Sequence, residues 1–491
     1  MTSANVRYRE AVLLTNTYPY GTGETFLHEE LKYVAAEFKK IYIYPLYLPR
    51  EINKKRGSQN SYGNTVLLQR EIPSNVIIME PLLKCDHKSI PGLLLYGLFN
   101  LAPLRTIFKE FLKKRAWQSF KRVRLFTSYA LIQRAIIGNR RTLKEISGYL
   151  KENHALLYCY WGDKSAMILP YLKRQMGIKA PFVVRFHGSD IFEEAKGLLP
   201  FREEIYSSTD YACPVSQKGA EYIKENYPAN LPRNIKVSHL GSINKLPYEE
   251  RVKLIRKPSS SGESEKIFRI ISCSNIIPLK RVELIAKAII LARKSIKKGY
   301  GNLCRELQIE WMHIGDGPLL ETITQICLTE ENIKSGHVSG EKEDDYWFVL
   351  TGALRHSEVI EQYGSFRPAL FINASRSEGV PVSIMEALSF GVPVIATNVG
   401  GTGELFNSIN SSRANEPGNG NLQQLEGEKG IGVLIPNNIT SSQLAEYILK
   451  FIALPQEERE TISKNARTNW EQNWDSDKNY TAFAKWLAQL N

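Results

Sequence analysis

Two glutamates with seven residues between them, Glu378 and Glu386, have the spacing that points most directly to chemistry. An apolar run ending near Ala374 is followed by a short polar loop, and Pro381 suits the first turn of a helix. Because free N–H groups at a helix amino terminus bind anions, we expect the loop around Gly379 to face a phosphate. Glu378 would then accept hydrogen bonds from hydroxyl groups beside that phosphate. Glu386, about two turns into the helix, would accept one from a ribose.

A pair of cations, Lys280 and Arg281, follows the apolar run Ile267–Ser272. The carboxyl ends of parallel strands meet at one edge of a sheet, so these cations are expected near the glutamate loop, where they could neutralise a diphosphate. A charge pair that merely begins a helix is the alternative. The turn containing Gly315 and Gly317 is another strand-to-helix connection of the same half of the chain.

The first half of the chain offers a glycine loop and a histidine. Gly21 and Gly23 follow the apolar run Ala11–Thr15 and permit close approach of the backbone to a ligand. Their spacing lacks the G-x-G-x-x-G pattern, which argues against a dehydrogenase. His187 ends another apolar run, where a histidine is either a packed side chain or a candidate for an active site.

The segment from Ser375 to Glu404 resembles the signature of the retaining group 1 glycosyltransferases. Its pattern is S-x-x-E-G-x-P-x-S-x-x-E-A-L-x-x-G-x-P-V-I-A-T, followed by a glycine-rich turn. Those enzymes have the GT-B fold and bind a nucleotide-sugar donor through this E-x7-E motif. The resemblance covers most of the second half of the chain. It implies that Glu378 contacts the donor sugar and that Glu386 contacts the nucleotide ribose, in agreement with the helix argument.

The same resemblance extends to three further elements. The family's usual arginine is replaced by Asn275, its lysine is kept as Lys280, and Arg281 is expected to supply the missing charge. The turn at residues 313–318 is similar to an element beneath the nucleotide, and the glycine loop to one over the donor phosphates. The motif from His187 to Asp190 resembles one whose histidine lies near the reacting sugar. We therefore expect His187, Glu378 and Lys280 to be catalytic, and the donor to be bound by Glu386, Arg281, Asn275, Gly379, Val380, Pro381, Val382, Gly315, Gly317, Gly21 and Gly23.

Alternating apolar runs and amphipathic stretches predict the fold. The runs are rich in Val, Ile, Tyr and Phe, which is typical of parallel strands buried on both faces with helices between them. They are Ala11–Thr15, Ile41–Leu46, Val76–Met79, Leu156–Trp161, Phe182–Phe186, Ile235–Leu240, Ile267–Ser272, Ile309–Ile314, Ala369–Asn373 and Val394–Thr397. We predict an α/β protein with two doubly wound, Rossmann-like domains. The resemblance implies the GT-B arrangement, in which they face across a cleft and the last helix returns to the first domain.

Composition places the domain boundary and limits the function classes. The predicted parts are an acceptor-side domain at 1–255, a polar linker at 256–266, a donor-side domain at 267–470 and a carboxyl-terminal helix at 471–491. Sixty-four Lys and Arg against 51 Asp and Glu give a net charge of +13, which favours an acidic partner. The six cysteines are scattered without metal-ligand spacing, so buried thiols are expected.

One basic segment, residues 104–124, departs from the alternation because it carries eight Lys or Arg and the single acid Glu110. Leu104, Ile107, Phe108, Phe111 and Leu112 would share one face of a helix there. Such a basic amphipathic helix suits an anionic membrane surface, and a solvated helix packed on its own domain is the equal alternative. With no signal-peptide core near the first residue and no apolar stretch of membrane-spanning length, we expect a cytoplasmic protein, peripheral on the inner face of the membrane if this helix binds lipid.

Together these features predict a retaining, metal-independent glycosyltransferase of cell-surface polysaccharide or glycolipid synthesis. It would move a sugar from a nucleotide-diphosphate sugar to a saccharide or lipid-linked acceptor. No cofactor or metal is expected, because no Asp-x-Asp stands where a metal-dependent transferase would place one. The alternatives are a GT-B phosphorylase, a nucleotide-sugar epimerase, or a non-catalytic sugar-nucleotide-binding subunit. Nucleic acid is not expected as a partner, because the basic run is amphipathic rather than a groove of cations interleaved with aromatics.

Overall fold

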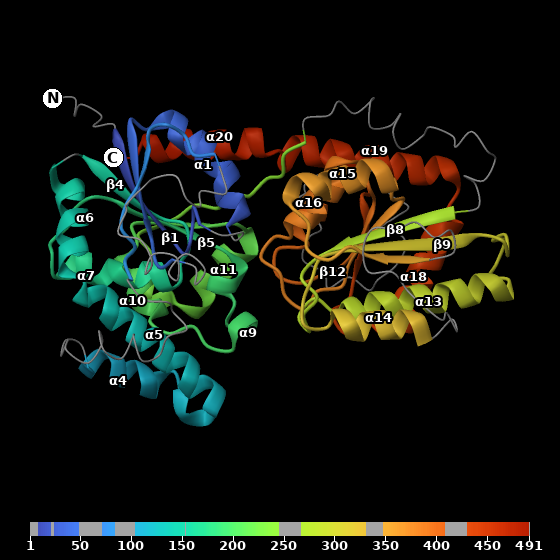
Figure 1. Cartoon of the computed structure of the whole chain (residues 1–491), viewed down its shortest axis with the longest axis horizontal. Coiled ribbons are helices and arrows are strands. Elements are labelled where there is room, and N and C mark those ends of the chain that lie inside the picture. The colour runs from blue at the N-terminus through green and yellow to red at the C-terminus, as the bar shows by residue number, and fades with distance from the viewer. Residues whose placement is uncertain are drawn as a thin grey trace, which may run out of the picture. The chain divides into compact units, whose positions relative to one another are not determined.

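The computed structural model describes residues 8–20, 24–48, 71–83, 104–152, 154–244, 267–329, 347–407 and 430–490. The chain forms two compact units, one made of Met1–Leu240 with Lys478–Asn491 and the other of Gly241–Asp477. Figure 1 shows that each unit is a sheet covered by helices. The predicted linker at 256–266 lies outside the described residues, so the predicted domain boundaries stay a prediction.

The first unit is built on a seven-stranded parallel sheet in the order β3-β2-β1-β4-β5-β6-β7. The strands are β1 (Glu10–Thr15), β2 (Lys40–Pro45), β3 (Val76–Ile78), β4 (Ala155–Cys159), β5 (Phe182–Phe186), β6 (Tyr211–Pro214) and β7 (Asn234–Ile235). Numbering rises in both directions from the β1–β4 pair, so the chain reverses its direction of winding there. The side chains of β1 alternate between two cores, with Val12 and Leu14 in one and Ala11 and Leu13 in the other.

Helices cover both faces of this sheet (Figure 1). On the face of Ala11 and Leu13 lie α1 (Thr25–Glu37) and the last helix, α20 (Ser476–Ala488), which buries Phe483 and Leu487 there. The helices against the opposite face are α5 (Phe120–Gly138), α6 (Arg140–Glu152), α7 (Leu169–Arg174) and α10 (Arg202–Ser208). The remaining helices described in this unit are α4 (Leu104–Lys113), η1 (Ala116–Gln118), η2 (Lys164–Ile168), α8 (Gly188–Ile191), α9 (Glu193–Lys196), α11 (Gln217–Asn226) and η3 (Pro228–Asn230).

The second unit repeats this plan with a six-stranded parallel sheet in the order β10-β9-β8-β11-β12-β13. Its strands are β8 (Ile267–Cys273), β9 (Gln308–Ile314), β10 (Phe348–Leu350), β11 (Leu370–Asn373), β12 (Val394–Thr397) and β13 (Gly432–Ile435). One face packs on α13 (Val282–Lys298), α14 (Leu320–Thr329) and α18 (Ser441–Ala453). On the other side of the sheet lie α15 (His356–Phe366), α16 (Val382–Ser389), α17 (Glu404–Asn407) and α19 (Gln456–Asn473) (Figure 1).

The predicted fold class is confirmed, because both units are α/β with an all-parallel sheet and the last helix packs on the first unit. Three short strands, β6, β10 and β13, had not been singled out as apolar runs. The run Ile235–Leu240 was predicted as a strand, but β7 contains only its first residue. Beyond it the chain still bonds to β6, but that strand ends at Pro214, which has no N–H to donate.

The predicted helix at 104–124 is wrong as a single element. The chain forms α4, turns at Arg115 in the left-handed region (φ 47°), makes η1 and then begins α5. The Ser119 side chain caps α5 by accepting a hydrogen bond from the Arg122 N–H at 3.2 Å. None of the helices among the described residues is long and apolar enough to cross a membrane.

Candidate active site

The winding of the second sheet brings Lys280 and Glu378 together. β8 and β11 are neighbours, but β8 leads to α13 on one face and β11 to α16 on the other, so the loops after them diverge. Such a switch point is where open α/β sheets bind ligands. Lys280 Nζ in one loop lies 2.5 Å from Glu378 Oε1 in the other, and Asn373 Nδ2 lies 3.4 Å from the same oxygen. Both ionised side chains are partly exposed, at 20% and 11%, so a ligand can reach them.

Glu386 lies in α16 and is buried, with its Oε1 3.0 Å from Nε2 of His356. His356 begins α15 and is 37% exposed, so the pair faces solvent through the histidine. The sequence analysis missed His356, since it stands 30 residues before Glu386 with no motif joining them. The predicted helix start holds, because Pro381 is the N-cap residue of α16 and Val382 its first residue.

Arg281 is buried, and its guanidinium donates hydrogen bonds mainly to backbone carbonyl oxygens. Its guanidinium donates to the carbonyl oxygens of Ala374 at 2.5 Å, Ser375 at 3.3 Å and Asn437 at 2.6 Å, and to Asn437 Oδ1 at 3.1 Å. It thereby fastens the loops after β8, β11 and β13 to one another. Burial, and secondarily the nearby Arg376 cation, lowers the pKa of Arg281. Its predicted contact with the donor is untested and stays a prediction.

An exposed arginine that the sequence analysis missed, Arg376, stands in the same loop as Glu378. Its backbone N–H donates to the Leu279 carbonyl at 2.8 Å, which joins the two loops of the switch point. Among the described residues its guanidinium has neither a hydrogen-bond nor an ion-pair partner. The predicted donor residue Asn275 is exposed in the loop after β8. The signal for Arg376 was its place inside the S-x-x-E-G block, where only the glutamate had been weighed.

Glycines allow neighbouring loops to pack closely against the two loops that carry Lys280 and Glu378. At Gly315 (φ 146°) a Cβ would lie 1.9 Å from the Ser274 carbonyl oxygen, and at Gly317 it would lie 2.4 Å from that of Ile276. In the loop after β12, Gly400 (φ 52°) approaches the Glu378 carbonyl so closely that a Cβ would lie 1.8 Å away. The two predicted glycines therefore support the loop that carries Lys280, and a contact of either with a donor stays a prediction.

The remaining predicted residues of the E-x7-E loop are Gly379, Val380 and Val382. The Gly379 carbonyl accepts the Gly401 N–H at 2.7 Å, while Val380 and Val382 are buried. The two valine side chains therefore hold the loop on the domain, and only the backbone groups of these three residues remain for a ligand.

Beneath the loop after β8, the buried His313 side chain makes a hydrogen bond through each of its ring nitrogens. Nδ1 lies 2.8 Å from Ser272 Oγ and Nε2 lies 3.0 Å from the Ser274 carbonyl oxygen, so Nε2 carries the proton. Burial lowers the pKa of His313 to about 4. The imidazole is therefore neutral near pH 7 and fixes the start of the loop.

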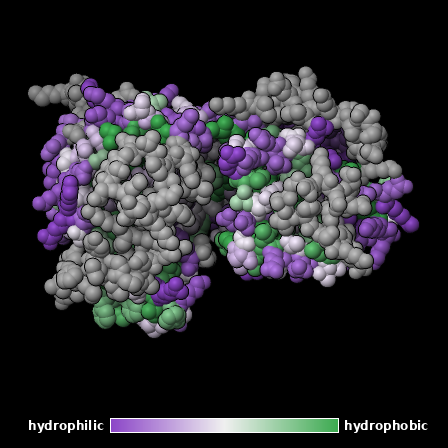
Figure 2. Space-filling model, in the orientation of Figure 1, coloured by the Kyte–Doolittle hydropathy of each residue, from purple (hydrophilic) through white to green (hydrophobic). Residues whose placement is uncertain are grey.

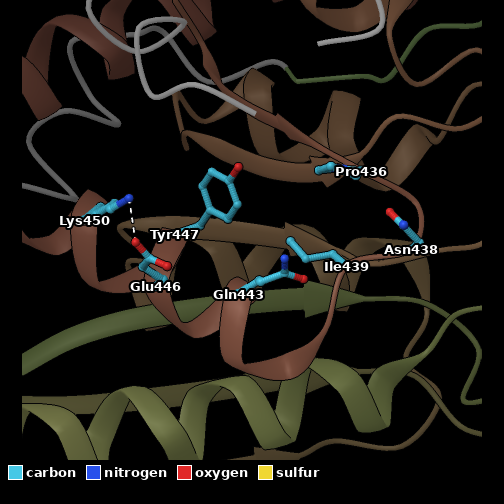
Figure 3. A pocket seen from close by; sticks show the side chains of 7 residues that line it. All are labelled: Pro436, Asn438, Ile439, Gln443, Glu446, Tyr447 and Lys450. Atoms are coloured by element: carbon cyan, nitrogen blue, oxygen red, sulfur yellow. Dashed lines mark ion pairs between the residues drawn. The ribbon is translucent and has the colours of Figure 1, made fainter. Parts of the chain in front are cut away.

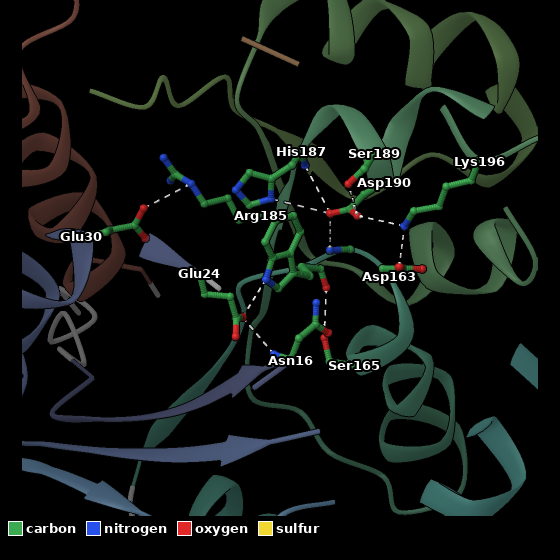
Figure 4. Close-up of polar contacts among 12 residues, drawn as sticks. Asn16, Glu24, Glu30, Asp163, Ser165, Arg185, His187, Ser189, Asp190 and Lys196 are labelled. Carbon is green, nitrogen blue, oxygen red and sulfur yellow. Dashed lines mark hydrogen bonds and ion pairs between the residues drawn. The ribbon is translucent and has the colours of Figure 1, made fainter. Parts of the chain in front are cut away.

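In the first unit, His187 follows β5 and lies near Asp190 (Figure 4). Its ring centroid is 4.2 Å from that of Trp161 and 5.0 Å from that of Tyr160. Nδ1 is 3.7 Å from Asp190 Oδ2, within ion-pair distance but beyond hydrogen-bond reach, and neither ring nitrogen has a hydrogen-bond partner among the described residues. A buried imidazole with two unused nitrogens is not explained by packing alone.

Glu24 organises the loop after β1 and was not predicted as a site residue. It takes a left-handed backbone conformation (φ 57°), and its carboxylate accepts the N–H groups of residues 16–18 at 2.6–2.9 Å. It also accepts the indole N–H of Trp161 at 2.7 Å, so it ties the loop to the ring that lies against His187. The predicted Gly21 and Gly23 of this loop lie outside the described residues.

Behind His187 lies a network of buried charges (Figure 4). Asp163 accepts from Lys196 at 2.7 Å and lies 3.5 Å from Arg202, whereas Asp190 accepts the N–H groups of Gly162 and His187 at 3.1 and 3.4 Å. Burial would raise the pKa of Asp163, but Lys196 and Arg202 bring it below its ordinary value. The Asp190 carboxylate thus joins the backbone at His187 to that at Gly162.

Two other observations concern ligands. Within the described ranges, no group of three or more His, Cys, Asp and Glu side chains is placed to hold a metal ion. A separate pocket beside α18, shown in Figure 3, contains none of the predicted site residues and is lined by Pro436, Asn438, Ile439, Gln443, Glu446, Tyr447 and Lys450.

Two doubly wound domains, one with an E-x7-E motif at its switch point, define the class of protein as a GT-B glycosyltransferase fold. Residues 255–469 match the model of the family described as glycosyl transferases group 1, which is the family that the sequence resembles. The chain is 24% identical over 324 residues to the putative teichuronic acid biosynthesis glycosyltransferase TuaC of Bacillus subtilis, covering 63% of this chain and 72% of that protein.

One further relative and one solved structure extend the comparison. The 2-deoxystreptamine N-acetyl-D-glucosaminyltransferase of Niallia circulans is 28% identical over 55% of this chain and 64% of its own length. The chain thus spans less than two thirds of that relative. HepE of Anabaena, solved with UDP and glucose, superposes with a TM-score of 0.55 at 14% identity, over 98% of this chain and 100% of HepE. At that identity the likeness shows the fold.

Proposed function

We propose that the protein transfers a sugar, with retention of anomeric configuration, from a nucleoside-diphosphate sugar to a saccharide or lipid-linked acceptor of the cell surface. The ion pair of Lys280 with Glu378 at the switch point of the second sheet is the observation that carries this proposal. The match to the group 1 family and the similarity to a teichuronic acid biosynthesis glycosyltransferase support it.

The donor replaces the ion pair when it binds. The diphosphate takes Lys280, the exposed Arg376 and the backbone N–H groups at the start of α16, because all three favour negative charge. Glu378, released from Lys280, then accepts hydrogen bonds from sugar hydroxyls. Glu386 accepts from the ribose, with its carboxylate oriented by His356.

Sugar transfer then breaks the bond between the anomeric carbon and the diphosphate oxygen and forms a bond to the acceptor oxygen on the same face. Negative charge grows on the leaving diphosphate, where fixed cations and N–H groups stabilise it without a metal ion. The leaving phosphate oxygen takes the acceptor's proton. His187 bonds the reacting sugar through a ring nitrogen that has no hydrogen-bond partner among the described residues.

A melting-temperature screen with UDP-, GDP-, ADP- and CMP-sugars tests donor binding. UDP-N-acetylglucosamine comes first, since one relative is named for that sugar and one structural neighbour was solved with UDP. We expect one donor to raise the melting temperature, and Glu386→Gln to abolish the shift. Glu446→Gln, in the pocket beside α18, is the matched control that keeps it. No shift with any donor, or equal shifts in all three proteins, would overturn the proposal.

Product analysis with the donor so identified tests the reaction. We expect transfer to an acceptor with the anomeric configuration of the donor, read from the anomeric proton coupling, full activity in EDTA, and loss of transfer in His187→Ala. Phosphate-dependent formation of a sugar phosphate would instead identify a phosphorylase, and sugar isomerisation without acceptor an epimerase. Donor binding without any turnover would identify a non-catalytic subunit.

A further inference from the structure

Exposed apolar side chains gather on one face of the first unit. Phe108, Leu112, Trp117 and Phe120 are exposed at 62%, 47%, 52% and 84%. The other large apolar residues exposed on the described parts of the chain are Ile77, Leu231 and Val349, at 38–42%, and they stand far apart in the sequence. Figure 2 shows the apolar surface over the α4 region of this unit. A patch of this kind on a folded domain marks an interaction site.

The exposure follows from the break at Arg115. Along α4, Ile107 and Phe111 pack on the core, and the Phe111 ring meets that of Phe126 at 5.3 Å. Phe108 and Leu112 form the next row of the helix and point away from this core. The left-handed turn then redirects the chain, and both Trp117, whose ring lies 6.3 Å from that of Phe111, and Phe120 are exposed beyond it. The sequence analysis placed these four residues of α4 on one face of a helix, whereas the structure packs Ile107 and Phe111 on the core and leaves Phe108 and Leu112 exposed.

The charges of this region are separated in the same way. Glu110, the only acid of residues 104–124, turns inward and accepts the Phe201 N–H at 2.8 Å. The acids at the edge of the patch, Glu203 and Glu193, are paired with Lys113 and Lys114. Four exposed cations have no ion-pair partner among the described residues, and they are Lys109, Arg115, Lys121 and Arg124.

We propose that this interfacial face, defined as the four exposed apolar residues and the four exposed cations, docks on an anionic lipid bilayer. Aromatic and aliphatic side chains enter the headgroup boundary while the cations meet lipid phosphates, and both are needed because neither set is large. Charge complementarity selects lipid over an apolar protein partner, since a protein groove would leave four cations without acids. The proposal does not depend on the sugar chemistry, because no residue of the face belongs to the candidate active site.

Vesicle co-sedimentation of the full chain tests the proposal. We expect binding to phosphatidylcholine vesicles that contain phosphatidylglycerol, little binding to phosphatidylcholine alone, and weakening by high salt. Phe108→Ser with Phe120→Ser, and separately Lys109→Glu with Lys121→Glu, should each reduce binding about ten-fold or more. The matched controls are Leu231→Ser, an isolated exposed leucine of the same unit, and Lys144→Glu, an exposed lysine of α6. Both should bind as the unchanged protein does.

Unchanged binding in the face variants, or no binding by the original chain, would overturn the proposal. So would a concentration-dependent dimer that the face variants abolish, because the face would then be an interface between copies. Because these variants alter exposed side chains only, their melting temperatures and donor-induced shifts should match those of the original chain. The donor shift also separates the two proposals, since it can fail while vesicle binding persists.

Discussion

The two units place their candidate site residues at the same edge of the same kind of sheet, but they build these sites from different interactions. In the second unit the site is ionic, with Lys280 against Glu378 and an exposed Arg376 beside them. In the first, His187 lies against two aromatic rings, and the Glu24 carboxylate accepts hydrogen bonds from four N–H groups. Doubly wound topology therefore fixes where side chains converge and leaves their chemistry to the loops.

The largest effect should come from the ionic site. Lys280→Ala removes the charge proposed to stabilise the leaving diphosphate, so kcat/KM should fall about 10²- to 10³-fold. Steady-state kinetics with the identified donor measures this. Lys144→Glu, on the surface of the first unit, is the control and should leave kcat/KM unchanged. A loss of less than about five-fold for Lys280→Ala would mean that the ionic site does not carry the chemistry.

Acid should weaken the second unit through His313. Its pKa is about 4 in the folded protein and about 6.5 in an unfolded chain, so between those values only the unfolded state takes a proton. The stability that His313 contributes is complete above pH 6.5 and is lost as the pH falls toward 4, by about 3 kcal/mol. Urea unfolding across this range measures it. His313→Gln should flatten the profile, and an identical profile in both proteins would contradict the assignment.

Variants of two arginines in the ionic site should distinguish a residue that stabilises the loops from one that binds the donor. Arg281→Ala leaves buried carbonyls unpaired and should lower the free energy of unfolding by about 2 kcal/mol. Arg376→Ala should leave the melting temperature unchanged but raise the donor KM about ten-fold, since an exposed charge is lost. The opposite pattern, a stable Arg281→Ala protein that has lost the donor, would show that Arg281 supplies the charge predicted from the sequence.

The smallest effect is expected from Glu24, which supports the aromatic site through Trp161. Glu24→Gln weakens the bonds that hold Trp161 against His187, so kcat should fall about ten-fold. Because Glu24 acts through Trp161, it is a positioning residue, and the donor KM should stay unchanged. Trp161→Phe should cost a similar factor, and the double variant should cost no more than either single one. Additive losses would show that the two residues act separately.

The sequence analysis succeeded where one rule governs both fold and site. Parallel strands end at a common edge, so Lys280 could be placed near Glu378 across 98 residues of chain. The same rule could not foresee the bonds of Arg281, because its acceptors come from loops 93 and 156 residues away whose path depends on tertiary packing. Nor could it foresee the left-handed Arg115 that divides the predicted basic helix, since such a conformation in a residue other than glycine leaves no pattern.

Because the last helix, α20, packs on the first unit, the core of that unit is completed late in synthesis. Arg185 is buried with Glu30, their charges 3.3 Å apart, and its guanidinium lies 4.6 Å from the Phe483 ring of α20. A ribosome has therefore released all of the first sheet, and then the whole second unit, before this core receives its final side chains. Until then the apolar face that α20 covers stays open, and exposed apolar surface of this kind makes a folding intermediate prone to aggregation.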